Sequence, residues 1–113
     1  MTPEEALPLL ESHSPPGETW PGHCRQVAKV ARSLANAVAE VRADVHPPRV
    51  EARALIHDIG RFKTHGPMHG WSGYILLKRL GHSALGRGCI THWTKGRPAE
   101  EMAASPAYSK SFI

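Results

Sequence analysis

The sequence predicts an all-α fold, a compact single domain of about five core helices joined by short connections. Apolar residues recur at spacings of three and four over several segments, and no segment alternates apolar and polar residues as a strand does. Glycine and proline separate these segments. With 113 residues, the chain is long enough to bury roughly two-thirds of its unfolded surface in one core.

The first helix is predicted over Pro3 to about Glu11. Thr2 has the residue type of an N-cap, Pro3 suits the first helical position, and Glu5 completes a capping box with Thr2. Residues 12–18 contain Pro15-Pro16-Gly17 and are predicted to form a loop. Residues 1–18 are therefore expected to be a helix and a loop that precede the core.

The longest helix is predicted from Pro21 to about Arg42. At about 100° per residue, its apolar side chains lie within roughly −20° to +80° of the direction of His23. His23 is therefore expected to open a buried stripe. The members of this stripe are Val27, Val30, Ala31, Leu34, Val38 and Val41.

A third helix is predicted from Arg49 to about Ile59. Gly60 is a typical residue just beyond a helix C-terminus, which places His57 and Asp58 in the last turn. The helix dipole is negative at that end and disfavours an aspartate. Asp58 therefore requires a positive charge nearby.

Two further core helices are predicted after a loop over residues 61–68. One begins at His69 and ends at Gly81, and the other spans about Ser83 to Trp93. The second contains Gly86 and Gly88, so tertiary packing must hold it. Their inward faces are expected to carry His69, Gly73, Leu76, Leu77 and Leu80, and then Leu85, Cys89 and His92.

The C-terminal part is predicted to be less regular. A short helix is expected over Pro98 to about Ala104, and residues 105–113 show no periodicity. The last residues, Ser111-Phe112-Ile113, are apolar, an ending more typical of an interrupted domain than of a finished one.

Four separate helices each bring a histidine, or a His-Asp pair, to the face that should point inward. One such histidine is more often a hydrogen-bonded core residue than a ligand, and a buried His57–Asp58 pair without a metal is the alternative here. Four together would carry a large desolvation cost, which one or two divalent ions would replace with coordination bonds. The predicted ligands are His23, His57, Asp58, His69 and His92.

A mixed set of imidazole and carboxylate ligands suits Fe, Mn, Co, Ni or Zn better than Ca. Such a site lowers the pKa of a bound water toward 7 and generates a hydroxide nucleophile beside a Lewis acid. The chemistry that these residue types favour is therefore hydrolysis.

The order of these residues resembles the HD superfamily of metal-dependent phosphohydrolases, in its branch of small uncharacterised HDIG-type proteins. The resemblance covers roughly Trp20 to Lys95 and rests on the motif His57-Asp58-Ile59-Gly60 with the flanking histidines in order. It implies that His23, His57 and Asp58 hold a first metal, and that Asp58 bridges to a second metal held by His69 and His92. Family members hydrolyse phosphomonoesters or phosphodiesters of nucleotides, and a minority are di-iron oxygenases.

The chain departs from the family pattern at one position. The family closes its metal shell with an aspartate on a later helix, and here no aspartate follows Asp58; the acids after His92 are Glu100 and Glu101. Either the site is degenerate, or a water, a glutamate or the neighbouring subunit of a homo-oligomer fills the position. The departure is the reason to consider a catalytically degenerate domain as an alternative.

Basic residues follow two of the predicted ligands. Arg61 and Lys63 come just after the motif, and Lys95 and Arg97 come just after His92. Lys63 and Lys95 are expected to neutralise charge on a phosphate, with Arg61, Arg97 and the loop residue His65 as further substrate contacts. The alternative is that they are solvated surface residues, because basic side chains are favoured at helix C-termini.

The charge is unevenly distributed along the chain. Residues 1–60 carry 6 Lys and Arg against 8 Asp and Glu, whereas residues 61–113 carry 8 against 2. A basic half-chain favours phosphate-bearing partners, although no recognised nucleic-acid-binding motif accompanies it. Because Glu4 and Glu5 stand where a signal peptide would be basic, and no run is long enough to span a membrane, we expect a cytoplasmic protein with reduced Cys24 and Cys89.

The sequence thus favours a metal-dependent phosphohydrolase acting on a nucleotide or a related small phosphate ester, with Asp58, Lys63 and Lys95 in catalytic roles. A catalytically degenerate nucleotide-binding or scaffolding module is the first alternative. A di-iron oxygenase is the second.

Overall fold

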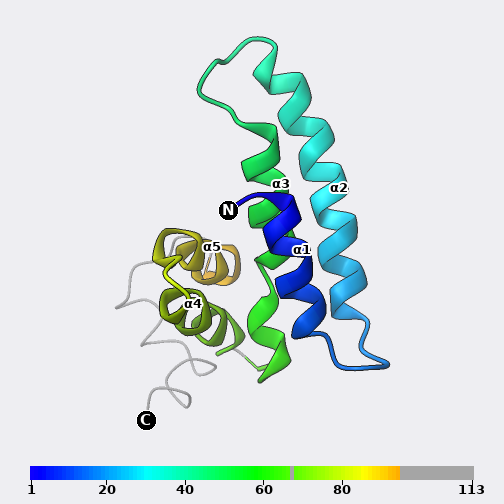
Figure 1. The fold of residues 1–113 in the computed structure, drawn as a ribbon, viewed down its shortest axis with the longest axis vertical. Coiled ribbons are helices and arrows are strands. Elements are labelled where there is room, and N and C mark those ends of the chain that lie inside the picture. Colours follow the sequence, from blue (N-terminus) through cyan, green and yellow to red (C-terminus); the bar gives the residue numbers. More distant parts are fainter. Residues whose placement is uncertain (67, 95–113) are drawn as a thin grey trace. The chain divides into compact units, whose positions relative to one another are not determined.

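The computed structural model describes residues 1–66 and 68–94, with the side chains of residues 92–94 not described. Within these ranges the chain is all-α, as predicted, with five α-helices, one short 3₁₀ helix and no strand (Figure 1). The described residues form two compact units, the first ending at Ile59 and the second beginning at Gly60. The elements in order are α1 (Pro3–Ser12), α2 (Trp20–Ala39), α3 (Pro47–Ile56), η1 (Ile59–Phe62), α4 (His69–Arg79) and α5 (Ser83–Thr94).

In the first unit, α3 packs against both α1 and α2. Figure 1 shows α2 and α3 running alongside each other, joined by the connection over residues 40–46. The start of α1 follows the predicted capping box, with the Thr2 N–H donating to Glu5 Oε1 at 3.3 Å. The buried side chains of α1 are Ala6 and Leu10, one turn apart on the same face.

The buried face of α2 is not the one that the sequence predicted. The helix buries Cys24, Ala28 and Ala35, which lie roughly 100° to 140° round the helix from His23. The predicted stripe is instead largely exposed: Leu34 is 64% exposed and Val41 is 84% exposed, with Val30 and Val38 also on the surface. Small side chains allow close approach of another helix, so shape rather than hydrophobicity selects the packed face.

The end of α3 also differs from the prediction. The helix ends at Ile56 rather than Ile59, so His57 is its C-cap and Asp58 lies between α3 and η1. The Ala54 carbonyl, which in a continuing α-helix would accept from the Asp58 N–H, accepts from the His57 backbone N–H at 3.4 Å and from the His57 ring at 2.6 Å. The histidine side chain therefore competes for the carbonyl that the next residue would need.

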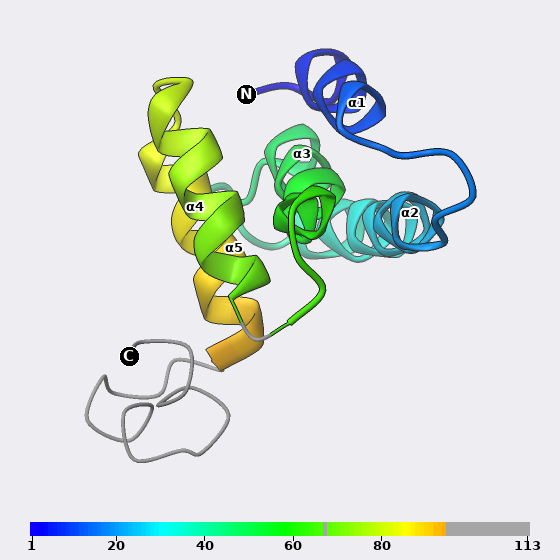
Figure 2. The same cartoon turned by 90° about the horizontal axis from the view of Figure 1, so that it is seen from below.

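The second unit contains α4 and α5, which pack closely against each other (Figure 2). Glycines make this approach possible: an added Cβ would lie 2.6 Å from the Cys89 carbonyl oxygen at Gly70, 2.9 Å from the Cys89 Sγ at Gly73 and 3.1 Å from the Tyr74 ring at Gly86. The sequence predicted that tertiary packing must hold the helix that contains Gly86 and Gly88. That helix is α5, and its close contacts with α4 are consistent with the prediction. Cys89 is a fully buried thiol in this packing.

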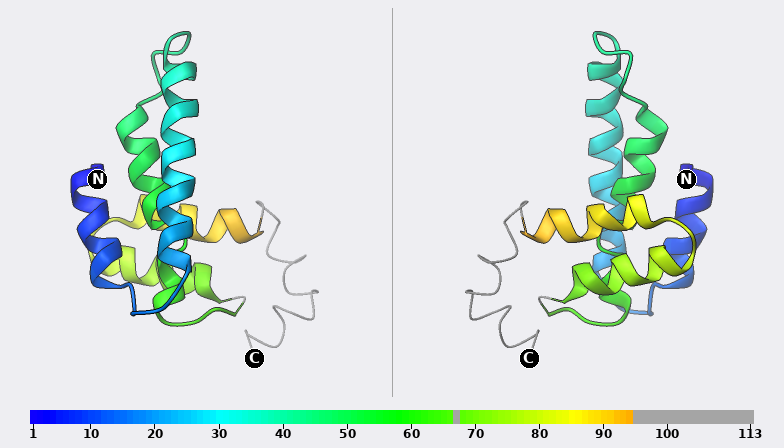
Figure 3. Two further views of the ribbon diagram at one scale, coloured as in Figure 1. Left: turned by 90° about the vertical axis from the view of Figure 1, so that its right-hand side faces the viewer. Right: turned by 90° about the vertical axis from the view of Figure 1, so that its left-hand side faces the viewer.

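The break between these helices falls where the sequence predicted it. Gly81 has φ +85°, a conformation that favours glycine, and the His82 N–H returns to the Leu77 carbonyl at 2.7 Å. Figure 3 shows the turn from two sides. The predicted helix over residues 98–104 and the irregular tail over 105–113 lie outside the described residues. No described helix has both the length and the apolar character needed to cross a membrane.

Substitutions at two neighbouring residues of α2, one exposed and one buried, should have different effects on the free energy of unfolding. Leu34→Ser should change the free energy of unfolding by at most about 0.5 kcal/mol, because Leu34 is on the surface. Ala35→Leu should destabilise by about 1–3 kcal/mol, because it adds volume to a packed contact. Urea unfolding of both variants measures the difference, and a larger loss for Leu34→Ser would mean that the packed face is the one predicted from the sequence.

Candidate metal centre

His57 is held at the C-terminal end of α3 with a defined proton position. Its Nδ1 lies 2.6 Å from the Ala54 carbonyl oxygen, and because a carbonyl can only accept, Nδ1 carries the hydrogen. The other ring nitrogen, Nε2, lies 3.5 Å from Asp58 Oδ2. In neutral histidine this Nε2 offers a lone pair, and a lone pair facing a carboxylate oxygen requires a cation or an added proton between them.

Asp58 is the buried anion of the cluster, with its side chain 5% exposed. It lies between His57, the C-cap of α3, and Ile59, the first residue of η1. A carboxylate at this depth is costly without a compensating positive charge. The electrostatic need that the sequence predicted is therefore present in the structure.

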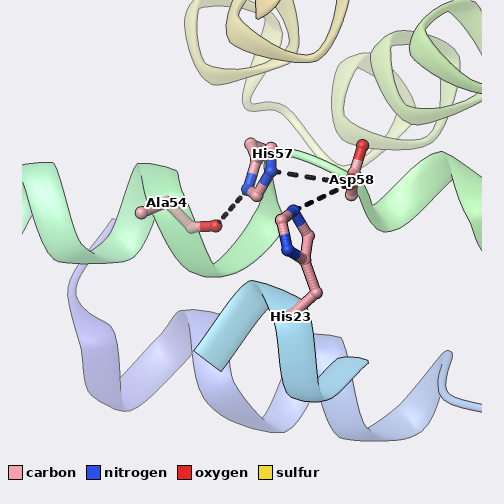
Figure 4. Close-up of polar contacts among 4 residues, drawn as sticks. All are labelled: His23, Ala54, His57 and Asp58. Carbon is pink, nitrogen blue, oxygen red and sulfur yellow. Dashed lines mark hydrogen bonds and ion pairs between the residues drawn. The ribbon is translucent and has the colours of Figure 1, made fainter. Parts of the chain in front are cut away.

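His23 comes to the same carboxylate from the first turns of α2. Its Nε2 lies 3.6 Å from Asp58 Oδ2, and its ring centroid is 5.5 Å from that of His57 (Figure 4). Its side chain is 57% exposed, so it does not open a buried stripe as the sequence suggested. One side of the cluster is consequently open to solvent.

These three residues form a set that fits a divalent transition metal. One ligand atom from each of His23, His57 and Asp58 lies within 4.8 Å of the others. With metal–ligand bonds of about 2.1 Å, two ligands of a tetrahedral site lie roughly 3.4 Å apart, close to the nitrogen–oxygen distances here. Two imidazoles and one carboxylate also match the borderline preference of Fe, Mn, Co, Ni and Zn.

A comparison with known families agrees with this geometry. The model of the HD domain family matches residues 22–105, about three-quarters of the chain. The chain belongs to the HD-domain family. The resemblance inferred from the His57-Asp58-Ile59-Gly60 motif is thereby confirmed, and with it membership of a superfamily of metal-dependent phosphohydrolases.

The HD domain also has a curated relative. The uncharacterized protein MJ0778 of Methanocaldococcus jannaschii is 37% identical to it over 78 residues, which are 69% of this chain and 45% of the relative. The chain therefore matches less than half of that relative's length. No solved structure matches the chain significantly.

His69 repeats in the second unit the arrangement seen at His57. The ring is buried, with the residue 1% exposed, and Nδ1 lies 3.0 Å from the Gly66 carbonyl, three residues earlier. The His69 backbone N–H donates to the same carbonyl at 3.1 Å. The ring therefore presents Nε2 as its lone-pair nitrogen, the form that metal-binding histidines take.

The other predicted site residues belong to the second half of the chain, and only some of them lie in the described part of the structure. Lys63 and His65 are exposed and Arg61 is half-buried. His92 lies on α5, but its side chain is outside the described part of the structure, and Lys95 and Arg97 are outside it altogether. Their predicted roles, like the ligand role of His69, stay predictions.

Sequence reasoning did not identify the backbone carbonyls that orient the histidines. Ala54 and Gly66 are not unusual by residue type, and their role depends on a helix ending after Ala54 and beginning after Gly66. The sequence held one signal that could have identified these carbonyls. Each belongs to the residue three positions before a predicted ligand histidine.

Gly60, the last residue of the motif, is required by packing. A Cβ there would overlap the His69 carbonyl and lie 2.5 Å from the Gly73 backbone nitrogen. Both atoms belong to the first two turns of α4, so Gly60 permits direct contact between the 3₁₀ turn and the helix that carries His69.

Metal binding should stabilise the fold through Asp58. Adding Mn²⁺ or Co²⁺ to chelator-treated protein should raise the Tm by several degrees, because a ligand at about 100 times its Kd adds about 2.7 kcal/mol. Asp58→Asn should lose this shift, since it removes the negative ligand, while His46→Ala should keep it because His46 is an exposed residue outside the cluster. An undiminished shift in Asp58→Asn would place the metal elsewhere.

Substitution at Gly60 should have a much larger effect than substitution at another glycine of the same unit. Gly60→Ala should destabilise by about 3 kcal/mol or more, because the overlap is with backbone that cannot easily move. Gly88→Ala should instead stabilise by about 0.5–1 kcal/mol, since nothing lies within 4 Å of its Cβ position on α5. Thermal unfolding by circular dichroism measures both, and similar effects at the two positions would contradict the packing role of Gly60.

Proposed function

We propose that this HD domain is a metal-dependent phosphohydrolase acting on a nucleotide or a related phosphate ester. The observation that carries the proposal is the convergence of His23 Nε2 and His57 Nε2 on one oxygen of Asp58. The open side at His23 supports a catalytic rather than a purely structural metal, because catalytic sites leave a coordination position for water or substrate.

The residues of the cluster would bind the metal ion and compensate its positive charge. His23 and His57 would hold a divalent transition metal through Nε2, and Asp58 would contribute the negative ligand. When bound, such an ion supplies a Lewis acid and brings the pKa of water toward 7. The Ala54 carbonyl would keep the His57 ring in the required orientation and increase its basicity.

A second ion is part of the proposal. His69 and His92 would be its ligands, with Asp58 bridging the two ions, as the family resemblance implies. The buried His69 ring has the proton arrangement that this role needs, with Nδ1 donating to the Gly66 carbonyl. The tautomer of His69, with Nε2 as the lone-pair nitrogen, therefore supports its proposed role as a metal ligand.

The phosphate of the substrate would be bound by cations of the second half of the chain. Lys63 and Lys95 would neutralise charge that develops on the phosphate, and Arg61, His65 and Arg97 would be further contacts. The excess of basic residues in 61–113, 8 against 2, supports a phosphorylated substrate.

One observation favours a second candidate, a nucleotide-binding module without catalysis. No aspartate lies between Asp58 and residue 113, so this stretch does not supply the aspartate that closes the metal shell in the family. Such a module would be stabilised by a nucleotide without converting it.

Turnover separates the two candidates. With Mn²⁺ or Co²⁺ present, the protein should release phosphate or a nucleoside from some member of a panel of nucleotides, and Asp58→Asn should lower kcat/KM by about 100-fold or more because a metal ligand is lost. Lys63→Gln should lower it about tenfold through loss of one charge-assisted contact. His46→Ala is the matched control and should retain full activity.

A metal-loaded protein that is stabilised by nucleotides yet releases no product would contradict the hydrolase and support the module. Activity that persists in Asp58→Asn would contradict both the assigned centre and its role in hydrolysis.

A further inference from the structure

A basic groove lies in the first unit, apart from the metal cluster. It has a volume of about 410 Å³ and is bordered by α1, α2 and α3. Apolar residues line part of it, including Leu7, Ala28 and Leu55, and three cations line another part, Arg25, Lys29 and Arg32. None of its lining residues belongs to the His23, His57 and Asp58 cluster.

The three cations are concentrated on one side of α2. Their spacings of four and three residues place them on one face of the helix. This face lies nearly opposite His23, because Arg25 follows His23 by two residues, or roughly 200° of rotation about the helix axis. Residues 1–60 carry only 6 Lys and Arg against 8 Asp and Glu, so half of the basic residues of an acidic part of the chain line one groove. This concentration is the feature that calls for an anionic partner.

The charges in the groove are unequally compensated. Arg32 Nη1 pairs with Glu51 Oε2 at 2.8 Å, which neutralises one cation. Arg25 is 3.9 Å from Glu11 in an exposed pair, which is a weak interaction. Lys29 is exposed and makes no ion pair with any residue that the structure describes. Arg25 and Lys29 are therefore the two cations available to a ligand.

The apolar lining restricts the class of that ligand. Leu7 is 36% exposed, so its side chain meets solvent beside the cations. The groove volume falls within the range of small-molecule sites, about 300–1,000 Å³, which combine an apolar surface with a few placed polar groups. An inorganic anion would use the cations and leave the exposed Leu7 side chain in contact with water.

We propose that this groove binds a small organic phosphate, with its phosphate on Arg25 and Lys29 and its apolar body against the exposed Leu7 side chain. A dianionic phosphate suits two adjacent cations, one of which offers the fork of donors that matches phosphate oxygens. Ser33, which also lines the groove, supplies a hydroxyl on the side of α2 that carries Lys29. The site is separate from the proposed hydrolytic centre and does not depend on it.

Benzylphosphonate is a suitable test ligand, because its P–C bond is not a phosphate ester and the hydrolytic centre cannot cleave it. Titrated into ¹⁵N-labelled protein as purified, it should give saturable amide shifts centred on Arg25, Lys29 and Leu7. Inorganic phosphate should bind more weakly, since it has no apolar body. Benzyl alcohol, which has no charge, should give no saturable shifts.

Matched variants decide between the groove and other sites. Lys29→Gln should weaken benzylphosphonate binding about tenfold through loss of a charge-assisted contact, and Leu7→Ser should weaken it several-fold. Arg49→Gln removes an exposed cation outside the groove and should leave the Kd within about twofold, as should Asp58→Asn in the metal cluster. Leu7 and Lys29 are surface residues, so both variants should fold, and unchanged amide spectra away from the groove check this.

Absence of saturable binding at millimolar benzylphosphonate would overturn the proposal. So would binding that Lys29→Gln leaves unchanged, binding that Asp58→Asn abolishes, or equal affinity for inorganic phosphate.

Discussion

The interaction on which the rest depends is the approach of two histidine nitrogens to one buried carboxylate oxygen. Asp58 Oδ2 lies 3.5 Å from His57 Nε2 and 3.6 Å from His23 Nε2. Since the His57 hydrogen is already committed to the Ala54 carbonyl, Nε2 and the carboxylate both offer lone pairs unless a cation is present. A divalent metal, or an added proton, between these atoms would make the interaction favourable.

The local fold is arranged to hold these groups in place. At the end of α3, the Ala54 carbonyl accepts from both the backbone N–H and the ring of His57. The second unit uses the same device, because the Gly66 carbonyl accepts from both the backbone and the ring of His69. In both cases a histidine at a helix terminus is oriented by the carbonyl three residues earlier. A backbone carbonyl that accepts from Nδ1 fixes the tautomer and the orientation of the ring.

Much of the fold could be predicted from sequence. The spacing of apolar residues, together with helix start and stop signals at Thr2, Gly81 and the proline-rich connections, predicted all five described helices. These signals act locally, so they can be recognised in the sequence. The packed face of α2 could not be predicted in this way. Val30, Leu34 and Val38 are more hydrophobic than Cys24, Ala28 and Ala35, yet the smaller residues form the contact because the closeness of α3 is a property of the partner helix.

The candidate site could also be predicted from the sequence only in part. The residue types and order of His23, His57 and Asp58 were sufficient to predict that they gather, because a buried carboxylate needs compensation wherever it lies. The end of α3 was misjudged, because the competition of the His57 ring for a carbonyl depends on its rotamer, which no spacing rule records. The glycine of the motif was predicted as a helix stop, while its packing role against the backbone of His69 and Gly73 depends on the position of α4.

The most direct test is an anomalous diffraction map, collected at the metal edge from crystals grown with Mn²⁺ or Co²⁺. We predict a peak at about 2.0–2.3 Å from His23 Nε2, His57 Nε2 and Asp58 Oδ2 together. A map with no peak there, and with a protonated His57 donating directly to Asp58, would contradict the account and reduce the cluster to a hydrogen-bonded pair.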